Sequence, residues 1–338
     1  MAYPMLTTAF KKAGRRLSRL DRTLIIVVVL VTSVFPVELF PNSPPPPKGI
    51  DGQFSGRQGQ VLVVKVPLAE EASEVKGAFL DRTIPFFREH RAGEPAGYLG
   101  LVGIDMQDAP GTYELAVTIR KGEQPATRLS YHVLVTKEKF AVEHLKLPKD
   151  KVDLDERTAA RWKSEQEQVR QALADNSALR LWQSGFVEPV NGRRTGIFGS
   201  VRIMNGQPRN PHNGEDIGAP LGTDVAVTND GVVRLTVDHV FSGRGVFVDH
   251  GLGFYSMYFH LSEILVKDGD LVKAGQVIGK VGATGRATGP HLHWGVKLNG
   301  ARVNPYALLD LPFKQGSGPA TVSSPTPQPA PEALSVTQ

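Results

Sequence analysis

The sequence predicts a mainly β protein in which two β domains are joined by a helix. Short alternating apolar runs separated by turn residues occupy residues 60–142. The period becomes helical over residues 154–177, and a glycine-rich, strand-like pattern follows from 186 to about 311. A chain of 338 residues is long enough for two domains with tails. We therefore expect an antiparallel β domain that is preceded by a β-sandwich and a connecting helix.

The composition excludes several classes of protein and site. The net charge is only +5, from 39 Lys and Arg against 34 Asp and Glu, and the excess is concentrated near the N-terminus. Without a basic patch in the body of the chain, we expect no nucleic-acid partner. There is no cysteine, which excludes disulfides, thiolate catalysis and cysteine-ligated zinc.

Residues 1–40 predict a cytoplasmic basic segment followed by a membrane-directed segment. The apolar run LIIVVVLVTSVFPV spans 24–37 and is shorter than the roughly 20 residues of a spanning helix. It contains Pro36 and lacks a clean A-x-A cleavage site. We favour a signal anchor over a cleaved signal peptide, with the basic end inside. Either alternative places the following residues outside the cytoplasm, in the cell envelope. The basic residues that precede the run are Lys11, Lys12, Arg15, Arg16, Arg19 and Arg22.

The next segments predict a linker, a β domain and a helix. Residues 41–59 begin PNSPPPP, which is typical of a Pro-rich spacer. Residues 60–148 have the strand lengths and turns of an immunoglobulin-like sandwich. No catalytic group of side chains is recognisable there, so His90 and His132 are interpreted as structural or surface residues.

Residues 149–184 contain the connecting helix, and residues 313–338 predict a disordered tail. Trp162, Val169 and Leu173 fall on one face of the helix, which Asp153 or Asp155 can cap. Its charged residues are interpreted as a solvated face. The tail is rich in Pro, Ser and Thr and poor in large apolar residues.

Residues 185–312 contain the candidate metal-ligating and catalytic residues. In HNGED, His212 and Asp216 stand four residues apart in what the flanking glycines indicate is a loop that enters a strand. Both side-chain types can ligate Zn²⁺, although H-x-x-x-D alone is a weak motif. In TGPHLHWGV, His291 and His293 share one face if the segment is a strand. One of the two could complete a set of three ligands with an open fourth position, and the other could then handle a proton.

Two further segments help to define the predicted site. YSMYFHL ends on His260, and a strand next to the one that bears His291 could aim His260 into the same cleft. His250 lies at a strand end before a glycine turn and is interpreted as a hydrogen-bonded structural residue. The glycine-turn hairpin at 266–282 resembles those of lipoyl and biotinyl carriers. However, Lys273 and Lys280 are not placed for attachment, so the hairpin is interpreted as scaffold.

Taken together, the motifs H-x-x-x-D, Y-x-H-L and G-P-H-L-H over residues 198–305 resemble the lysostaphin-type (LytM-like) zinc endopeptidases, which hydrolyse peptidoglycan. The resemblance implies one zinc ion per chain, held by His212, Asp216 and His293, with His260 and His291 as catalytic residues. It also implies a small antiparallel β domain and peptidoglycan peptides as the substrate. Glu215 departs from the family pattern, in which this position holds a small apolar residue.

The resemblance leaves an alternative function open. Some envelope proteins of this fold have lost the metal ligands and regulate cell-wall amidases. That alternative predicts gaps at the five positions, and none is missing here. We therefore expect a periplasmic enzyme of the cell envelope that is anchored in the inner membrane or secreted, and the sequence does not identify any envelope protein partner.

Overall fold

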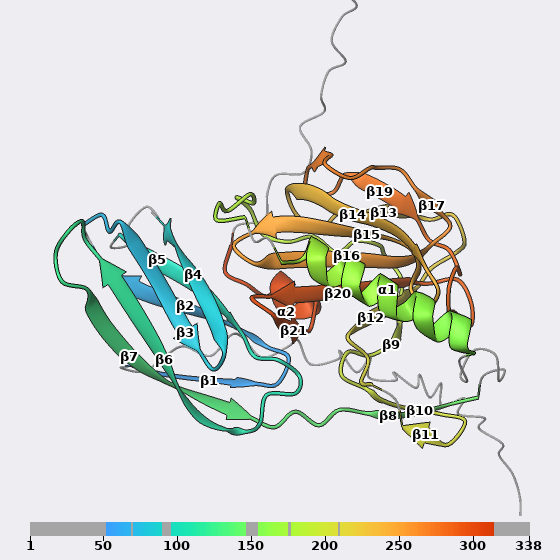
Figure 1. Cartoon of the computed structure of the whole chain (residues 1–338), viewed down its shortest axis with the longest axis horizontal. Coiled ribbons are helices and arrows are strands. Elements are labelled where there is room, and N and C mark those ends of the chain that lie inside the picture. The colour runs from blue at the N-terminus through green and yellow to red at the C-terminus, as the bar shows by residue number, and fades with distance from the viewer. Residues whose placement is uncertain are drawn as a thin grey trace, which may run out of the picture. The chain divides into compact units, whose positions relative to one another are not determined.

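The computed structural model describes residues 52–68, 70–89, 96–146, 155–174, 177–208 and 210–313. The predicted membrane-directed segment and most of the predicted linker and tail lie outside these residues. Within the described part of the chain, no helix is long and apolar enough to cross a membrane. The described residues are mainly β, as the sequence predicted (Figure 1).

The N-terminal β domain is a seven-stranded sheet in the order β1-β7-β6-β3-β4-β5-β2. Strand β4 pairs with β3 through residues 82–85 and with β5 through residues 86–89, so it connects the two halves of the sheet. The inward side chains of both halves form one buried apolar cluster that includes Phe79 and Leu115. The immunoglobulin-like class of this domain stays a prediction. Its strands are β1 (Gln53–Arg57), β2 (Val61–Pro67), β3 (Glu74–Phe79), β4 (Arg82–Glu89), β5 (Gly97–Gly103), β6 (Gly111–Arg120) and β7 (Thr127–Thr136).

The C-terminal β domain contains an eight-stranded sheet in the order β18-β14-β15-β16-β20-β12-β9, with β21 paired to β20. A three-stranded sheet, β13-β19-β17, accompanies it. The strands are β9 (Arg193–Gly196), β12 (Gly214–Gly218), β13 (Asp224–Ala226), β14 (Gly231–His239), β15 (Gly243–Gly251), β16 (Phe254–Leu261), β17 (Glu263–Ile264), β18 (Leu271–Val272), β19 (Val277–Lys280), β20 (Leu292–Leu298) and β21 (Ala301–Val303). The short helix α2 (Tyr306–Leu309) follows β21.

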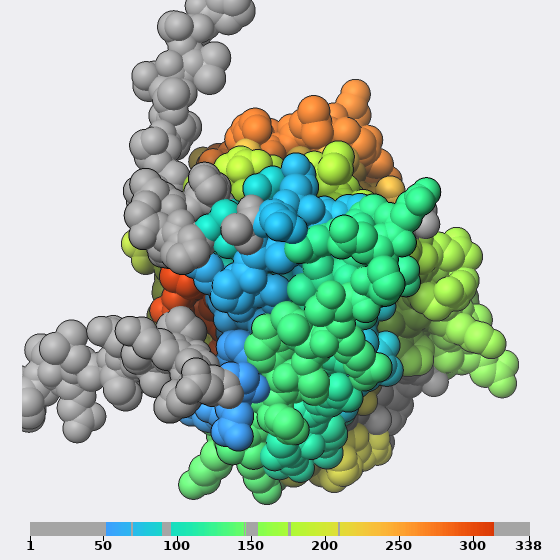
Figure 2. Space-filling model, turned by 90° about the vertical axis from the view of Figure 1, so that its left-hand side faces the viewer, coloured from blue at the N-terminus to red at the C-terminus, as the bar shows by residue number. Residues whose placement is uncertain are grey.

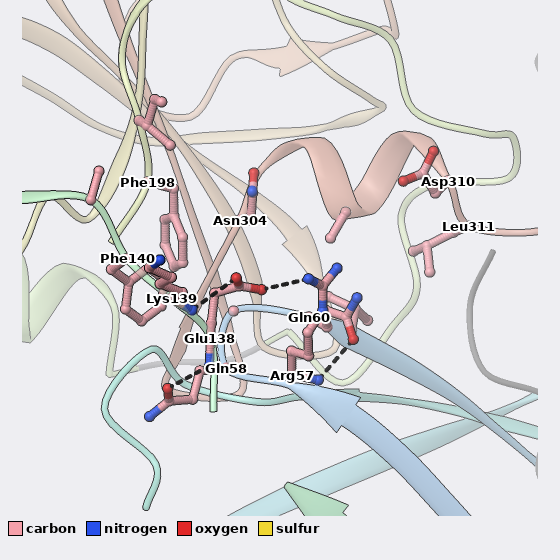
Figure 3. A pocket seen from close by; sticks show the side chains of 15 residues that line it. Arg57, Gln58, Gln60, Glu138, Lys139, Phe140, Phe198, Asn304, Asp310 and Leu311 are labelled. Atoms are coloured by element: carbon pink, nitrogen blue, oxygen red, sulfur yellow. Dashed lines mark hydrogen bonds and ion pairs between the residues drawn. The ribbon is translucent and has the colours of Figure 1, made fainter. Parts of the chain in front are cut away.

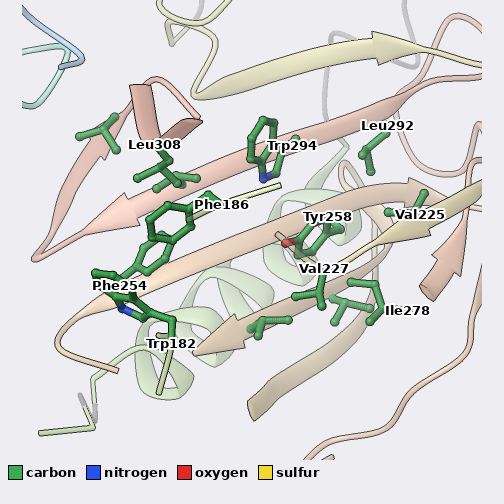
Figure 4. Close-up of a cluster of buried hydrophobic side chains, with 14 of the residues drawn as sticks. Trp182, Phe186, Val225, Val227, Phe254, Tyr258, Ile278, Leu292, Trp294 and Leu308 are labelled. Carbon is green, nitrogen blue, oxygen red and sulfur yellow. The ribbon is translucent and has the colours of Figure 1, made fainter. Parts of the chain in front are cut away.

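The main core of this domain lies on one face of the large sheet. Trp294 and Tyr258 project from β20 and β16 into a cluster that also receives Val225 and Ile278 from the small sheet (Figure 4). These four side chains have no exposed surface. Because side chains alternate along a strand, the neighbouring residues of β16 and β20 must face the other side of the sheet.

Helix α1 (Glu156–Ala172) covers part of that other side. Val169 and Leu173 pack on a second apolar cluster that includes Phe247 and Met257. The side chain of Asp155 accepts a hydrogen bond from the backbone N–H of Thr158, so Asp155 caps the helix, as one of the two predicted alternatives. Helix α1 does not cover the part of this face that β20 and β12 form.

The helix corrects one prediction about its charged residues. Glu165 was assigned to a solvated face, yet it is buried, whereas Trp162 is 40% exposed. The carboxylate of Glu165 accepts a hydrogen bond from the backbone N–H of Val240 and pairs with Arg161. A charged group tolerates burial when such partners are present. Trp162 contacts Phe241 edge to face, with ring centroids 6.4 Å apart.

Three predicted boundaries also differ from the structure. Strand β1 lies inside the predicted linker, because residues 53–57 pair with β7. Phe313, predicted as the start of the tail, is buried and its ring centroid lies 4.9 Å from that of Trp182. Strand β8 (Val142–Leu145) lies in the predicted sandwich, but it pairs with β10 (Val201–Met204), which in turn pairs with β11 (Gln207–Pro208).

The two β domains are joined by extensive contacts, and Figure 2 shows the face of the molecule that the N-terminal domain, coloured blue to green, forms. The guanidinium of Arg302 on β21 donates to both carboxylate oxygens of the buried Asp105, at 2.7 and 3.0 Å. Leu99 and Leu101 of β5 belong to the same apolar cluster as the C-terminal core. The two domains therefore share packing, which the sequence-based division did not predict.

Candidate metal centre

Two predicted ligands lie directly opposite each other on neighbouring strands. Asp216 of β12 is the cross-strand partner of His293 of β20 in an antiparallel pair. Their neighbours Ile217, Leu292 and Trp294 point into the main core, so Asp216 and His293 project from the opposite face of the sheet. His212 reaches the same point from the loop before β12, as the flanking glycines predicted.

The three side chains bring one atom each into a compact triangle. His212 Nε2 lies 2.9 Å from His293 Nδ1 and 3.0 Å from Asp216 Oδ1. His293 Nδ1 lies 2.9 Å from the same oxygen. Ligands that bind one tetrahedral Zn²⁺ at about 2.0–2.1 Å stand about 3.3 Å apart. The set can therefore hold a metal ion, because its atoms are already at nearly the required separation.

The surrounding backbone fixes the orientation of these rings. Nδ1 of His212 lies 3.1 Å from the carbonyl oxygen of Ile197, to which it donates when it carries the proton, and Nε2 is then left with a lone pair. A side chain on Gly214 would place its Cβ 2.6 Å from His293 Nε2 and 2.5 Å from the carbonyl oxygen of Trp294. Glycine at position 214 is therefore a packing requirement of the site.

The two remaining predicted residues, His260 and His291, lie next to the triangle. Their ring centroids are 4.7 Å apart, and Nε2 of His291 lies 3.8 Å from Asp216 Oδ1. In both rings, Nδ1 is at 2.8 Å from a backbone carbonyl, that of Thr284 for His260 and of Gly289 for His291. With the Nδ1 proton donated to the backbone, Nε2 of each neutral ring is the atom that can accept a proton.

The backbone of His260 adopts a left-handed conformation, with φ of +63°. The register of β15 and β16 shifts close to this residue, between Arg244 and Val246, and the His260 N–H donates to the carbonyl of Ser242. Non-glycine residues with positive φ are uncommon and often belong to functional sites. This irregular backbone near the end of β16 explains how the His260 ring points toward the triangle.

Burial dominates the electrostatics of the site. Burial, together with the neighbouring His293 and His291, lowers the pKa of His260 to about 3. Burial also lowers the pKa of His293 to about 4, against the opposing effect of Asp216. For Asp216, burial alone would raise the pKa, but the hydrogen bonds with His212 and His293 outweigh it and the pKa falls below its usual range. The two histidines are therefore neutral and Asp216 is ionised at neutral pH.

Glu215, the departure from the family pattern, faces away from this site. Its side chain has no exposed surface and forms a two-bond ion pair with Arg194 of β9. Burial raises its pKa, which Arg194 opposes. Glu215 therefore flanks the site and does not line it, because consecutive residues of β12 face opposite sides of the sheet.

Among the other described histidines, His250 has structural surroundings. His250 is fully buried, donates from Nδ1 to the carbonyl of Asp230 at 2.7 Å and lies 2.7 Å from the hydroxyl of Ser256 through Nε2. This bears out its interpretation as a structural residue. His132 is exposed on β7, and His90 lies outside the described residues.

A separate cavity of about 250 Å³ lies between the two β domains (Figure 3). Arg57, Gln60 and Glu138 line it from the N-terminal domain, and Phe198 and Asn304 line it from the C-terminal domain. None of the five predicted site residues contributes to its wall. The chemistry therefore belongs to the sheet face described above and not to this cavity.

Known proteins resemble this chain, and the family match lies in the C-terminal β domain. The model of peptidase family M23 matches residues 210–305, which include all five predicted site residues. A crystal structure titled putative peptidase M23, from Pseudomonas aeruginosa, is 32% identical, with a TM-score of 0.58. That match covers 75% of this chain and 94% of the other. The chain belongs to peptidase family M23.

Two named relatives match less than a third of this chain. Peptidoglycan DD-endopeptidase ShyA of Vibrio cholerae is 49% identical over 94 residues, which are 28% of this chain and 22% of that protein. DD-carboxypeptidase/endopeptidase Mpg of Neisseria meningitidis is 42% identical over 97 residues, which are 29% of this chain and 22% of that protein. The matches thus span less than a quarter of the length of these two relatives.

The sequence analysis missed two residues that shape the M23 site. Arg202 of β10 binds the second oxygen of Asp216, at 2.8 Å. Thr284 supplies the carbonyl that orients His260. The segment FGSVR, which carries Arg202, was part of the family resemblance, but no feature of the segment indicates that its arginine points at a predicted ligand. Backbone carbonyls such as that of Thr284 leave no signal in a sequence.

Proposed function

We propose that this chain is a zinc-dependent endopeptidase that hydrolyses cross-links or stem peptides of bacterial peptidoglycan. The observation that carries the proposal is the triangle of His212, Asp216 and His293 with two further imidazoles beside it. The names of the relatives, peptidoglycan DD-endopeptidase ShyA and DD-carboxypeptidase/endopeptidase Mpg, support peptidoglycan peptides as the substrate class.

The donor set favours zinc and a catalytic type of site. Two imidazole nitrogens and one carboxylate oxygen suit Zn²⁺, and three protein ligands leave one coordination position open. Such a set is typical of catalytic zinc, whereas structural zinc is bound by four protein ligands. Bound zinc would act as a Lewis acid on a carbonyl group and would lower the pKa of a water molecule.

His260 and His291 would then carry the protons. Each ring is held by its Nδ1 proton and is left with a basic Nε2. His260 is neutral and its Nε2 is free, so this ring can accept a proton from an attacking water molecule. His291 is 14% exposed at its side chain and lies near Asp216, where it could donate to the leaving amine. Which ring serves as the base is part of the proposal.

We also propose that the protein works outside the cytoplasm, in the cell envelope, and is attached to the membrane by residues 1–40. Support comes from the sequence pattern and from a substrate that lies outside the cytoplasm. The alternative, a silent module that regulates amidases, requires gaps among the five residues, and the described structure has all of them in one group.

A digestion of peptidoglycan tests the proposed activity. The zinc-loaded protein is incubated with purified sacculi and with cross-linked muropeptide dimers, and the products are identified by mass spectrometry. We expect new peptide ends from the wild type and none from His293→Ala, which removes a ligand. His291→Ala should keep its zinc and lose turnover. Zinc binding without any change in the muropeptides would contradict the enzyme and favour the regulator.

A further inference from the structure

The two carboxylate oxygens of Asp216 have different partners. Oδ1 lies at about hydrogen-bond distance from both ligand histidines, at 2.9 and 3.0 Å. Oδ2 accepts a hydrogen bond from Nη2 of Arg202 at 2.8 Å. Gly196 of β9 also packs closely against Oδ2, since a Cβ at this position would lie only 2.3 Å from that oxygen. The carboxylate thus has one oxygen for the metal and one for the protein.

Arg202 is itself held by a residue from another part of the chain. Its Nε donates to Oε2 of Glu143 at 3.3 Å, and the two side chains are only 21% and 25% exposed. Glu143 lies on β8, which runs parallel to β10 with Glu143 directly paired to Arg202. Strand β8 belongs to the stretch that connects the N-terminal β domain to helix α1. A continuous line of contacts therefore runs from this connection to the metal ligand.

We propose that Arg202 is a positioning residue that makes Asp216 a one-oxygen ligand, and that Glu143 on β8 orients Arg202. The proposal rests on the proposed function only in that the triangle takes a metal ion. An arginine on Oδ2 prevents this oxygen from approaching the metal, so the fourth coordination position stays open for chemistry. Glu143 makes the connection between the domains a part of the metal centre, although it lies outside the segment that matches the family model.

A second arginine–carboxylate pair, with its carboxylate on β12, provides a matched control. Arg194 pairs with Glu215, the residue next to Asp216, but on the opposite face of β12. Removal of either arginine deprives a carboxylate of β12 of its partner. Only Arg202 contacts a predicted metal ligand, whereas Arg194 stabilises a carboxylate with no exposed surface. Loss of Arg202 should therefore weaken zinc binding, whereas loss of Arg194 should lower the stability of the fold.

The experiment uses the full chain and three readouts that do not depend on peptidase activity. These are zinc affinity by competition with a chromophoric chelator, the visible spectrum of the Co²⁺-substituted protein, and the melting temperature of the metal-free protein. For Arg202→Ala we expect zinc to bind 10–100-fold more weakly, as for other lost partners of metal ligands. The Co²⁺ bands should shift as Asp216 becomes free to bind through both oxygens. Arg202→Lys should recover part of the affinity, and Glu143→Gln should lose less than Arg202→Ala.

The control should behave in the opposite way. Arg194→Ala should lower the melting temperature by roughly 5–10 °C, because a buried carboxylate loses its partner, and should bind zinc within about threefold of the wild type. The proposal is overturned if Arg202→Ala has the wild-type zinc affinity and Co²⁺ spectrum, or if Arg194→Ala weakens zinc as much. A wild-type protein that binds zinc but cleaves no peptidoglycan would refute the proposed peptidase activity. The zinc-binding comparisons would still test the role of Arg202.

Discussion

Asp216 and His293 are direct cross-strand partners on β12 and β20, and their ligand atoms Oδ1 and Nδ1 lie 2.9 Å apart. Opposite residues of an antiparallel pair have Cβ atoms about 5 Å apart, so the register of the sheet fixes two of the three predicted ligands. A shift of β12 by one residue would turn Asp216 into the core. The rigidity of the centre is thus a property of the sheet that carries it.

We expect Gly214→Ala to remove the metal site without changing any ligand. The new Cβ would collide with His293 Nε2 and with the carbonyl of Trp294, so the His293 ring must move. Zinc content after refilling should fall well below one per chain. Gly289→Ala is the control, because its Cβ meets nothing within 4 Å, and it should bind zinc normally. Full zinc occupancy in Gly214→Ala would show that the site is less tightly packed than described.

His260→Asn should separate catalysis from metal binding. Asparagine tolerates the positive φ of this position and can still donate a hydrogen bond toward Thr284, but it cannot serve as a base. We expect kcat on muropeptide dimers to fall by roughly 10²–10⁴, the usual contribution of a general acid or base. Zinc content should stay at the wild-type level. Loss of zinc in this variant would instead identify His260 as a ligand.

The metal-free protein should lose stability as the pH falls, and His250 contributes to this loss together with His260 and His293, whose pKa values are also lowered. The buried ring of His250 has a pKa of about 4, whereas the unfolded chain has an ordinary histidine. Between about pH 6.5 and pH 4 only the unfolded state binds this proton, so stability decreases as the pH falls. The contribution of His250 approaches about 1.4 kcal/mol per pH unit within this window and stops below it. Chemical unfolding at several pH values measures the slope, and an NMR titration of His250 near pH 6.5 would contradict it.

The ion pair between the two β domains should stabilise the whole chain. Asp105 is buried and accepts two side-chain hydrogen bonds and one backbone hydrogen bond from Arg302. We expect Asp105→Ala to cost about 2–4 kcal/mol of unfolding free energy, because charged hydrogen bonds are lost in a buried place. The exposed pair of Arg128 and Glu114 is the control, and Glu114→Ala should cost much less than Asp105→Ala, because solvent screens an exposed pair. Equal costs for the two variants in urea unfolding would show that the domains are only loosely joined.

The sequence predicted most of the site, because its residues occur in strand-encoded motifs. The i, i+2 spacing of His291 and His293 correctly indicated a shared face, since both rings lie near Asp216. The roles of these residues as ligands and proton carriers stay predictions. The mainly β class was also recognisable from alternation and glycine turns.

The remainder depends on tertiary contacts that no local pattern reports. Glu165 looked like a surface residue until its contact with the Val240 amide was known. Strand β8 is short and pairs with a segment about 60 residues away, so its partner could not be inferred from the sequence. Phe313 stands at the edge of a Pro-rich tail but packs on Trp182. Arg202 became recognisable only through its distance to Asp216.

The most direct test of the account is the zinc content of the purified protein after removal of all metal and refilling with zinc. The account predicts one zinc per wild-type chain by elemental analysis. It predicts almost none in His212→Ala or His293→Ala and close to one in His291→Ala. A wild-type protein that takes up no zinc, or a His293→Ala variant that keeps it, would contradict the assignment of His212, Asp216 and His293 as the metal centre.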